Sequence, residues 1–292
     1  MKLNKVAIPL GLATMWLMGG MGYPFLSAAT KELAPMNLVL IRTLGTTLIL
    51  ALIFLCTEIS TLRNIRLDRD LGITVLCALL FYPICSGSLA IASSQIPGAL
   101  TALLFSTLPV ISTIFAIYRG EHPHRRVIFG LVLSIVGVVL LIGVPDERIN
   151  LLGVVAGVIS VFTWFIATEI WIKYLPRYSI LLATTLQAFF GALGTWMIKP
   201  IFTSQAITWD LVINPNVLFL IFSLATQHFA YLWLTTRVSG LVLMLFSIIN
   251  PLVAGITGYL LFGQSITIMQ CFSGLALLIG VYQIIRSQPV KV

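Results

Sequence analysis

Apolar runs of about 20 residues follow one another along almost the whole chain, with short polar connectors between them. Roughly 20 apolar residues in a helix suffice to cross the hydrocarbon core of a bilayer. The mean hydropathy is +1.06, and only 9% of the 292 residues are charged, whereas a soluble domain carries about 25%. So little charge cannot coat a soluble protein of this size. The predicted fold class is therefore an all-α polytopic membrane protein.

Cutting the chain at charges, prolines and polar clusters predicts ten transmembrane helices. They cover approximately residues 6–30, 36–57, 71–93, 97–118, 127–144, 151–173, 178–199, 216–236, 240–262 and 266–286. The connectors leave no room for a soluble domain, so we expect the protein to act within the bilayer.

The basic residues predict the orientation. With ten spans both termini lie on one side, and a cytoplasmic N-terminus leaves only Lys31, Arg42, Arg148 and Lys199, of 17 Lys and Arg, outside the cytoplasmic loops and tails. Such an excess of cytoplasmic Lys and Arg is the rule in membrane proteins. We therefore expect a multi-pass plasma (bacterial inner) membrane protein with both termini in the cytoplasm. The same rule accounts for the net charge of +8 without nucleic acid as a partner.

The two halves of the chain resemble each other at an offset of 142 positions, as from Pro109 to Pro251 and from Gly98 to Gly240. The shared offset predicts a duplication of five spans, with repeats at 1–147 and 148–292. Because five is odd, the second repeat enters the membrane in the opposite sense. Inverted repeats of this kind are the architecture of many secondary transporters.

Short motifs in both halves resemble the EamA-like branch of the drug/metabolite transporter superfamily. In the first half they are Ile96 to Leu104, Thr107 to Val110, Gly120-Glu121, Gly130 and Leu141 to Gly143, together with Arg42. In the second half they are Ser239 to Leu241, Asn250 to Leu252, Gly263-Gln264 and Leu277 to Gly280. The sequence departs from the family pattern at Gln264, where Glu is usual, and at Thr184, where no second Arg matches Arg42.

The resemblance implies two inverted five-helix repeats around a central cavity, built mainly from the first, third, fourth, sixth, eighth and ninth spans. It also implies export or exchange of small organic solutes without ATP hydrolysis. No Walker A sequence is present, which agrees with transport that is not driven by hydrolysis.

Charged residues inside spans are the first functional candidates, because a charge in the bilayer is costly. Glu169 lies well inside an apolar run, one helical turn before Lys173. Two interpretations stay open for it, a local ion pair with Lys173 and the binding of a substrate ammonium group or a proton. A proton is accordingly the candidate coupling ion. Arg42 lies outside the cavity helices that the resemblance implies, so a structural role is favoured for it.

Polar and aromatic residues within the spans complete the predicted substrate-binding set. Gln227, His228 and Tyr231 share one face of the eighth span, and the offset pairs His228 with Ser86, which follows Tyr82 in the third span. The first span contributes Trp16 and Tyr23, and the sixth contributes Trp164 at mid-membrane depth. Trp196 is better explained as an interfacial anchor.

Three prolines within spans are predicted hinges, namely Pro24, Pro109 and Pro251, because a helix-interior proline removes a hydrogen bond. Pro24 follows a glycine-rich stretch, so we expect the first helix to be kinked or partly unwound there.

Together these features predict a secondary transporter that exports an amino acid or related metabolite by alternating access. Uptake or exchange by a carrier of the same superfamily is the alternative, and a channel is disfavoured because no pore-lining rings are evident. No converging nucleophile, base or metal ligands are present, so we expect no catalytic residues, no metal, no cofactor and no enzymatic activity. The expected partners are the small solute and the lipid bilayer, with the chain as a monomer or weak dimer.

Overall fold

The computed structural model describes residues 2–96, 98–142, 150–263 and 268–287, and over these ranges it contains helices and no strand. The first half contains α1 (Lys2–Ala29), α2 (Pro35–Thr57), η1 (Ile59–Asn64), α3 (Arg69–Leu79), η2 (Leu80–Ser86), α4 (Gly87–Gln95), α5 (Gly98–Phe105), α6 (Leu108–Tyr118) and α7 (Arg125–Ile142). The second half contains α8 (Leu151–Tyr174), α9 (Ile180–Phe202), α10 (Trp209–Val212), α11 (Pro215–Thr235), α12 (Gly240–Met244), α13 (Phe246–Phe262) and α14 (Ile268–Ser287).

Seven helical stretches of the described residues are long and apolar enough to cross a membrane, which confirms a polytopic membrane protein. They are Val6–Ala29, Pro35–Thr57, Arg69–Gln95, Leu151–Tyr174, Ile180–Phe202, Pro215–Thr235 and Gly240–Phe262. The other three predicted spans coincide with shorter apolar helices, α5 with α6, α7 and α14. The count of ten therefore stays a prediction.

The predicted fourth span, 97–118, contains two helices, α5 and α6. The chain leaves the helix after Phe105 and starts α6 at Leu108, which places Pro109 in the first turn of α6. A proline is well tolerated there because the amide hydrogen that it lacks would have no partner within the helix. The ninth span is also interrupted, between α12 and α13 at Leu245, while Pro251 lies inside α13.

The two interruptions meet in the interior of the bundle. The Ser106 hydroxyl donates to the Ala102 carbonyl at 2.9 Å and lies 3.0 Å from the Ser247 carbonyl. The Ser247 hydroxyl in turn donates to the Met244 carbonyl at 2.8 Å. Side chains thus supply hydrogen bonds where the helices are interrupted, as lipid-embedded backbone requires.

Two of the spans contain a proline and stay helical. The first helix, expected to be kinked or partly unwound, is not unwound, since it runs from Lys2 to Ala29 with Pro24 inside it and a proline removes only one hydrogen bond of the helical ladder. The third span widens at Pro83 into a π-helical segment, η2. Such segments are frequently found at functional sites.

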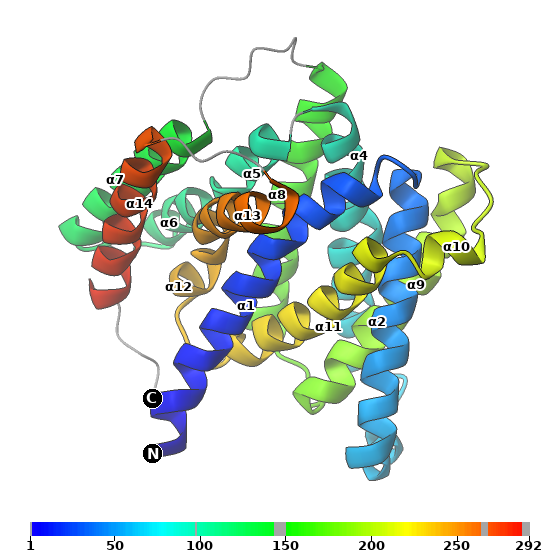
Figure 1. The fold of residues 1–292 in the computed structure, drawn as a ribbon. Helices are drawn as coiled ribbons and strands as arrows, with labels where there is room; N and C mark the ends of the chain where they lie inside the picture. The colour runs from blue at the N-terminus through cyan, green and yellow to red at the C-terminus, as the bar shows by residue number, and fades with distance from the viewer. Residues whose placement is uncertain (1, 97, 143–149, 264–267, 288–292) are drawn as a thin grey trace.

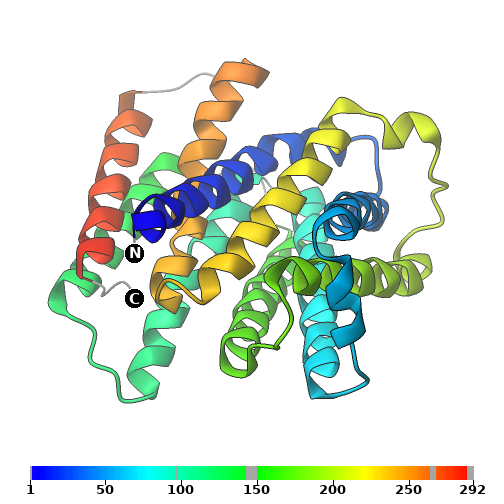
Figure 2. The same cartoon turned by 90° about the horizontal axis from the view of Figure 1, so that it is seen from below.

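The helices pack as pairs around a central group (Figures 1 and 2). α1 packs against α11 and α13, α8 packs against α3, η2 and α4, and α2 packs against α9. α7 and α14 form a separate pair at one edge of the bundle, joined to the rest mainly through α13. α14 ends on the side of the bundle at which α1 begins (Figure 1).

The α7–α14 pair depends on glycines that let the two backbones touch. A Cβ atom built on Gly280 would lie 2.6 Å from the Gly130 carbonyl oxygen, and one built on Gly137 would lie 2.8 Å from the Leu277 amide nitrogen. Both distances are shorter than van der Waals contact, so these positions accept no side chain without a shift of backbone. Small residues at helix crossings are the usual means of close packing in membranes.

We therefore expect Gly280→Ala to destabilise the protein by roughly 1–3 kcal/mol through overpacking, measured as a lower melting temperature in detergent. Gly255→Ala is the matched control, because a Cβ atom there meets nothing within 4 Å and alanine favours the helix. Equal melting temperatures for the two variants would contradict this account of the crossing.

Candidate solute-binding site

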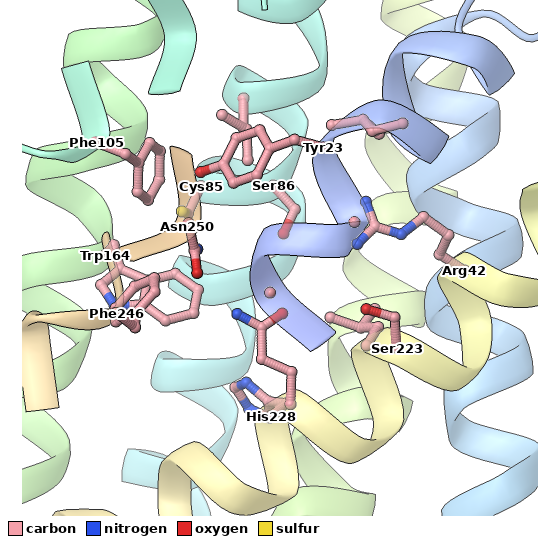
Figure 3. Close-up of a pocket in the computed structure, with 16 residues that line it drawn as sticks. Tyr23, Arg42, Cys85, Ser86, Phe105, Trp164, Ser223, His228, Phe246 and Asn250 are labelled. Carbon is pink, nitrogen blue, oxygen red and sulfur yellow. The ribbon is translucent and has the colours of Figure 1, made fainter. Parts of the chain in front are cut away.

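A cavity opens where helices from both halves of the chain converge (Figure 3). Its polar lining consists of Tyr23, Arg42, Ser86, Ser223, Gln227, His228 and Asn250. Its other walls consist of Gly19, Gly22, Leu26, Cys85, Leu89, Phe105, Trp164, Leu224 and Phe246. Arg42 is the one charged residue among them.

The cavity is narrow in this conformation. Its free volume is about 70 Å³, whereas pockets that hold drug-sized ligands span roughly 300–1,000 Å³. A solute larger than a few water molecules therefore requires the surrounding helices to move apart.

Glycines on α1 bring that helix close to the cavity wall. A Cβ atom on Gly19 would lie 2.7 Å from the Gln227 amide nitrogen and 3.1 Å from the Asn250 side chain, and one on Gly20 would overlap Val253. These glycines let α1 approach both α11 and α13. The Tyr23 hydroxyl, one turn further along α1, faces the Asn250 side chain (Figure 3).

His228 is held in place from α9 and η2. Its Nε2 atom lies 2.9 Å from Oε1 of Gln187, a fully buried residue of α9. The imidazole ring contacts Phe81 and Tyr82 of η2, with ring centroids 5.3 and 5.2 Å apart. The π-helical segment thus presents two consecutive aromatic side chains to the histidine.

Three side chains form a hydrogen-bonded group at one end of the cavity, those of Trp164, Thr168 and Tyr231. The Trp164 indole donates to the Tyr231 hydroxyl at 3.0 Å, and the Thr168 hydroxyl lies 2.5 Å from the same oxygen. Thr168 and Tyr231 are displaced from the cavity-lining Trp164 and His228 toward the C-terminal ends of α8 and α11, the ends that the sequence predicts to face the cytoplasm.

Five of the nine predicted substrate-binding residues line the cavity, Tyr23, Ser86, Trp164, Gln227 and His228. The other four, Trp16, Tyr82, Glu169 and Tyr231, are not part of its lining. Tyr82 and Tyr231 are buried in the helix bundle, and each is only 1% exposed. Trp16 packs among core residues, and its indole nitrogen is buried without a hydrogen-bond partner.

Glu169 forms an ion pair with Arg119, at the C-terminal end of α6, and not with Lys173. Of the two interpretations left open for Glu169, the local pair with Lys173 is therefore not the one that the structure shows. The Lys173 ammonium instead lies 5.1 Å from the centroid of the Tyr174 ring. A neighbour fifty residues away in the sequence cannot be recognised from helical spacing.

Among the polar and aromatic lining residues, sequence reasoning missed five, Arg42, Phe105, Ser223, Phe246 and Asn250. Ser223 had a detectable signal, because it precedes Gln227 by one helical turn on the same face. Arg42 was visible as an intramembrane charge but was assigned a structural role. In the part of the chain that the structure describes, no group of three or more His, Cys, Asp or Glu side chains is placed to hold a metal ion.

We expect Tyr231→Phe to lower the unfolding free energy by about 1–3 kcal/mol, because it leaves the Trp164 indole without its acceptor. The measurement is the melting temperature of the purified protein. Tyr259→Phe, at a tyrosine that is 52% exposed, is the matched control and should leave the melting temperature unchanged. Equal melting temperatures for the two variants would contradict the stabilising role of the Tyr231 hydroxyl.

Comparison with known proteins supports the fold and the family. A solved crystal structure matches with a TM-score of 0.78 over 96% of this chain and 98% of its own, at 13% identity, which shows a shared fold. Three curated relatives are described as uncharacterized transporters. They come from Clostridium kluyveri (25% identity, 73% of this chain and 71% of the relative), Archaeoglobus fulgidus (27%, 75% and 78%) and Bacillus subtilis, there called YvbV (23%, 95% and 91%).

The model of the EamA-like transporter family matches residues 7–143. This match confirms the resemblance carried by the motifs of the first half. The protein is thus a multi-pass membrane transporter, and its residues 7–143 match the model of the EamA-like transporter family.

Proposed function

We propose that this transporter exports a small organic solute, an amino acid or related metabolite, across the bacterial inner membrane by alternating access. The observation that carries the proposal is the cavity, which lies between helices of both halves of the chain and combines aromatic walls with few charges. A wall of this kind suits an amphipathic solute, because aromatic faces bind both apolar groups and ammonium groups.

The packing of the helices supports two repeats at 1–147 and 148–292. Under the 142-residue offset the first span corresponds to the sixth, and the third span corresponds to the eighth. The contact of α1 with α11 then has its counterpart in the contact of α8 with α3, η2 and α4. α2 packs against α9, and α7 packs against α14. Under the same offset, each of these pairs joins a helix of the first half to its equivalent in the second half.

Pseudo-symmetric pairing favours alternating access, since two related halves can exchange conformations. In the present conformation the Trp164–Tyr231 hydrogen bond and the Arg119–Glu169 ion pair both lie toward the C-terminal end of α8. We expect both contacts to separate when the cavity opens to the cytoplasm to receive a solute for export.

The test is transport of labelled amino acids and metabolites by purified protein in proteoliposomes, with and without a pH gradient. We expect saturable transport that falls at least about tenfold in Trp164→Ala and His228→Ala, a loss of roughly 1.4 kcal/mol or more, because both side chains line the cavity. Trp196→Ala is the control, as Trp196 is 62% exposed. Saturable transport of no solute in the panel would overturn the proposal, and unsaturable flux would indicate a channel.

The same vesicles test Glu169 as the site of proton coupling. Its carboxylate pairs with Arg119 and does not line the cavity, so we expect Glu169→Gln to retain any dependence of transport on the pH gradient. Loss of that dependence, with transport itself preserved, would assign the coupling proton to Glu169.

A further inference from the structure

Arg42 is the one charged residue that lines the cavity. It extends from α2, and its guanidinium group points toward the space between α1 and η2 (Figure 3). Its Nε atom is buried without a hydrogen-bond partner. Across the described ranges, the ion pair found is that of Arg119 with Glu169, so no carboxylate of these residues neutralises Arg42.

An unpaired guanidinium at this depth is costly, and such charges persist in membrane proteins where they face a cavity and bind a partner. The acidic residues of the sequence lie in connectors or near helix ends, apart from Glu169, which is already paired. The missing anion is therefore best supplied from outside the protein. Arginine presents a planar set of donors that matches a carboxylate with two parallel hydrogen bonds.

A second unpartnered group lies across the cavity. Asn250 is only 2% exposed, and its Oδ1 atom is buried with no hydrogen-bond partner although the residue lines the cavity. It offers an acceptor to an N–H group of a bound solute. Phe105, Trp164 and Phe246 lie on the same side as Asn250, opposite Arg42 (Figure 3).

The cavity thus has a cationic end and an apolar aromatic end with one polar acceptor. With Arg42 as its one charged lining residue and no acidic one, it repels a solute whose only charge is positive more strongly than its aromatic faces attract it. With a single cation, it is also poorly suited to a doubly charged phosphate, which usually meets several basic groups.

We propose that Arg42 binds the carboxylate of the transported solute, so that the substrates are small monocarboxylates with an apolar body, with or without an amino group. This inference rests on the proposed function, since it assigns the substrate class of the same cavity. The carboxylate is required, whereas the amino group adds a contact with Asn250.

Two matched sets of probes test the requirement, one small and one aromatic. Each contains an amino acid, the same molecule without its amino group, and the same molecule without its carboxylate. The sets are L-valine, 3-methylbutanoate and isobutylamine, and L-phenylalanine, 3-phenylpropionate and phenethylamine. Binding to the purified full chain is measured by the rise in melting temperature with ligand concentration, since a ligand that binds the folded state stabilises it.

We expect the amino acid and the carboxylate of at least one set to raise the melting temperature in a saturable manner, and the amine of that set to have no effect. Arg42→Gln should weaken carboxylate binding at least about tenfold, and Arg42→Lys should weaken it less because the charge is kept. Arg237→Gln is the matched control, because Arg237 contacts Trp233 and not the cavity.

Binding of the amines as strong as that of the carboxylates, or unchanged carboxylate binding in Arg42→Gln, overturns the inference. The comparison of the three probes on the wild-type chain decides the question even where the Arg42→Gln variant does not fold. Carboxylate binding without transport in proteoliposomes would overturn the proposed function and leave the binding assignment intact. Transport of other solutes without carboxylate binding would overturn the assignment of Arg42 and leave the proposed transport function intact.

Discussion

The structure depends on one constraint, that every backbone N–H and C=O group in the lipid must find a hydrogen-bond partner within the protein. Long apolar runs meet it by forming helices, because a helix satisfies its own backbone. Departures from regular α-helix are then tolerated only where other protein groups surround them. The π-helical segment η2 and the interruptions after Phe105 and at Leu245 lie in the interior, next to the cavity or close to it. The places where the helices are irregular are therefore also the places where polar groups gather.

Close contact between helices is the second requirement, and glycine provides it. Gly19 and Gly20 let α1 approach α11 and α13 beside the cavity, and Gly130, Gly137 and Gly280 join α7 to α14 at the edge. The two groups of glycines have different structural roles. Those on α1 bring Tyr23 to Asn250 and shape the cavity, whereas those on α7 and α14 hold together a pair of helices that does not line the cavity.

The electrostatics of the cavity follow from the same low-dielectric environment. Arg119 and Glu169 neutralise each other in an ion pair, while a lone guanidinium such as that of Arg42 attracts an anion strongly because water screens it little. The hydrogen bonds of Tyr231 with Trp164 and Thr168 lie toward the C-terminal ends of α8 and α11, the ends that the sequence predicts to face the cytoplasm. An anion that reaches Arg42 meets a cavity that is cationic at one end and aromatic at the other.

The sequence by itself determined the helical membrane fold and the approximate position of each apolar segment, because both follow from local hydropathy. Of the residues that it predicts to bind substrate, Tyr23, Ser86, Trp164, Gln227 and His228 lie at the cavity, since polar groups within apolar runs usually face the interior of the bundle. Only the tertiary structure decided the partners of the charged groups. Glu169 pairs with Arg119 and not with its helical neighbour, and Arg42 lies at the cavity although its helix was not expected there. The physical reason is that helical spacing fixes which residues share a face, whereas the packing of distant helices fixes what that face meets.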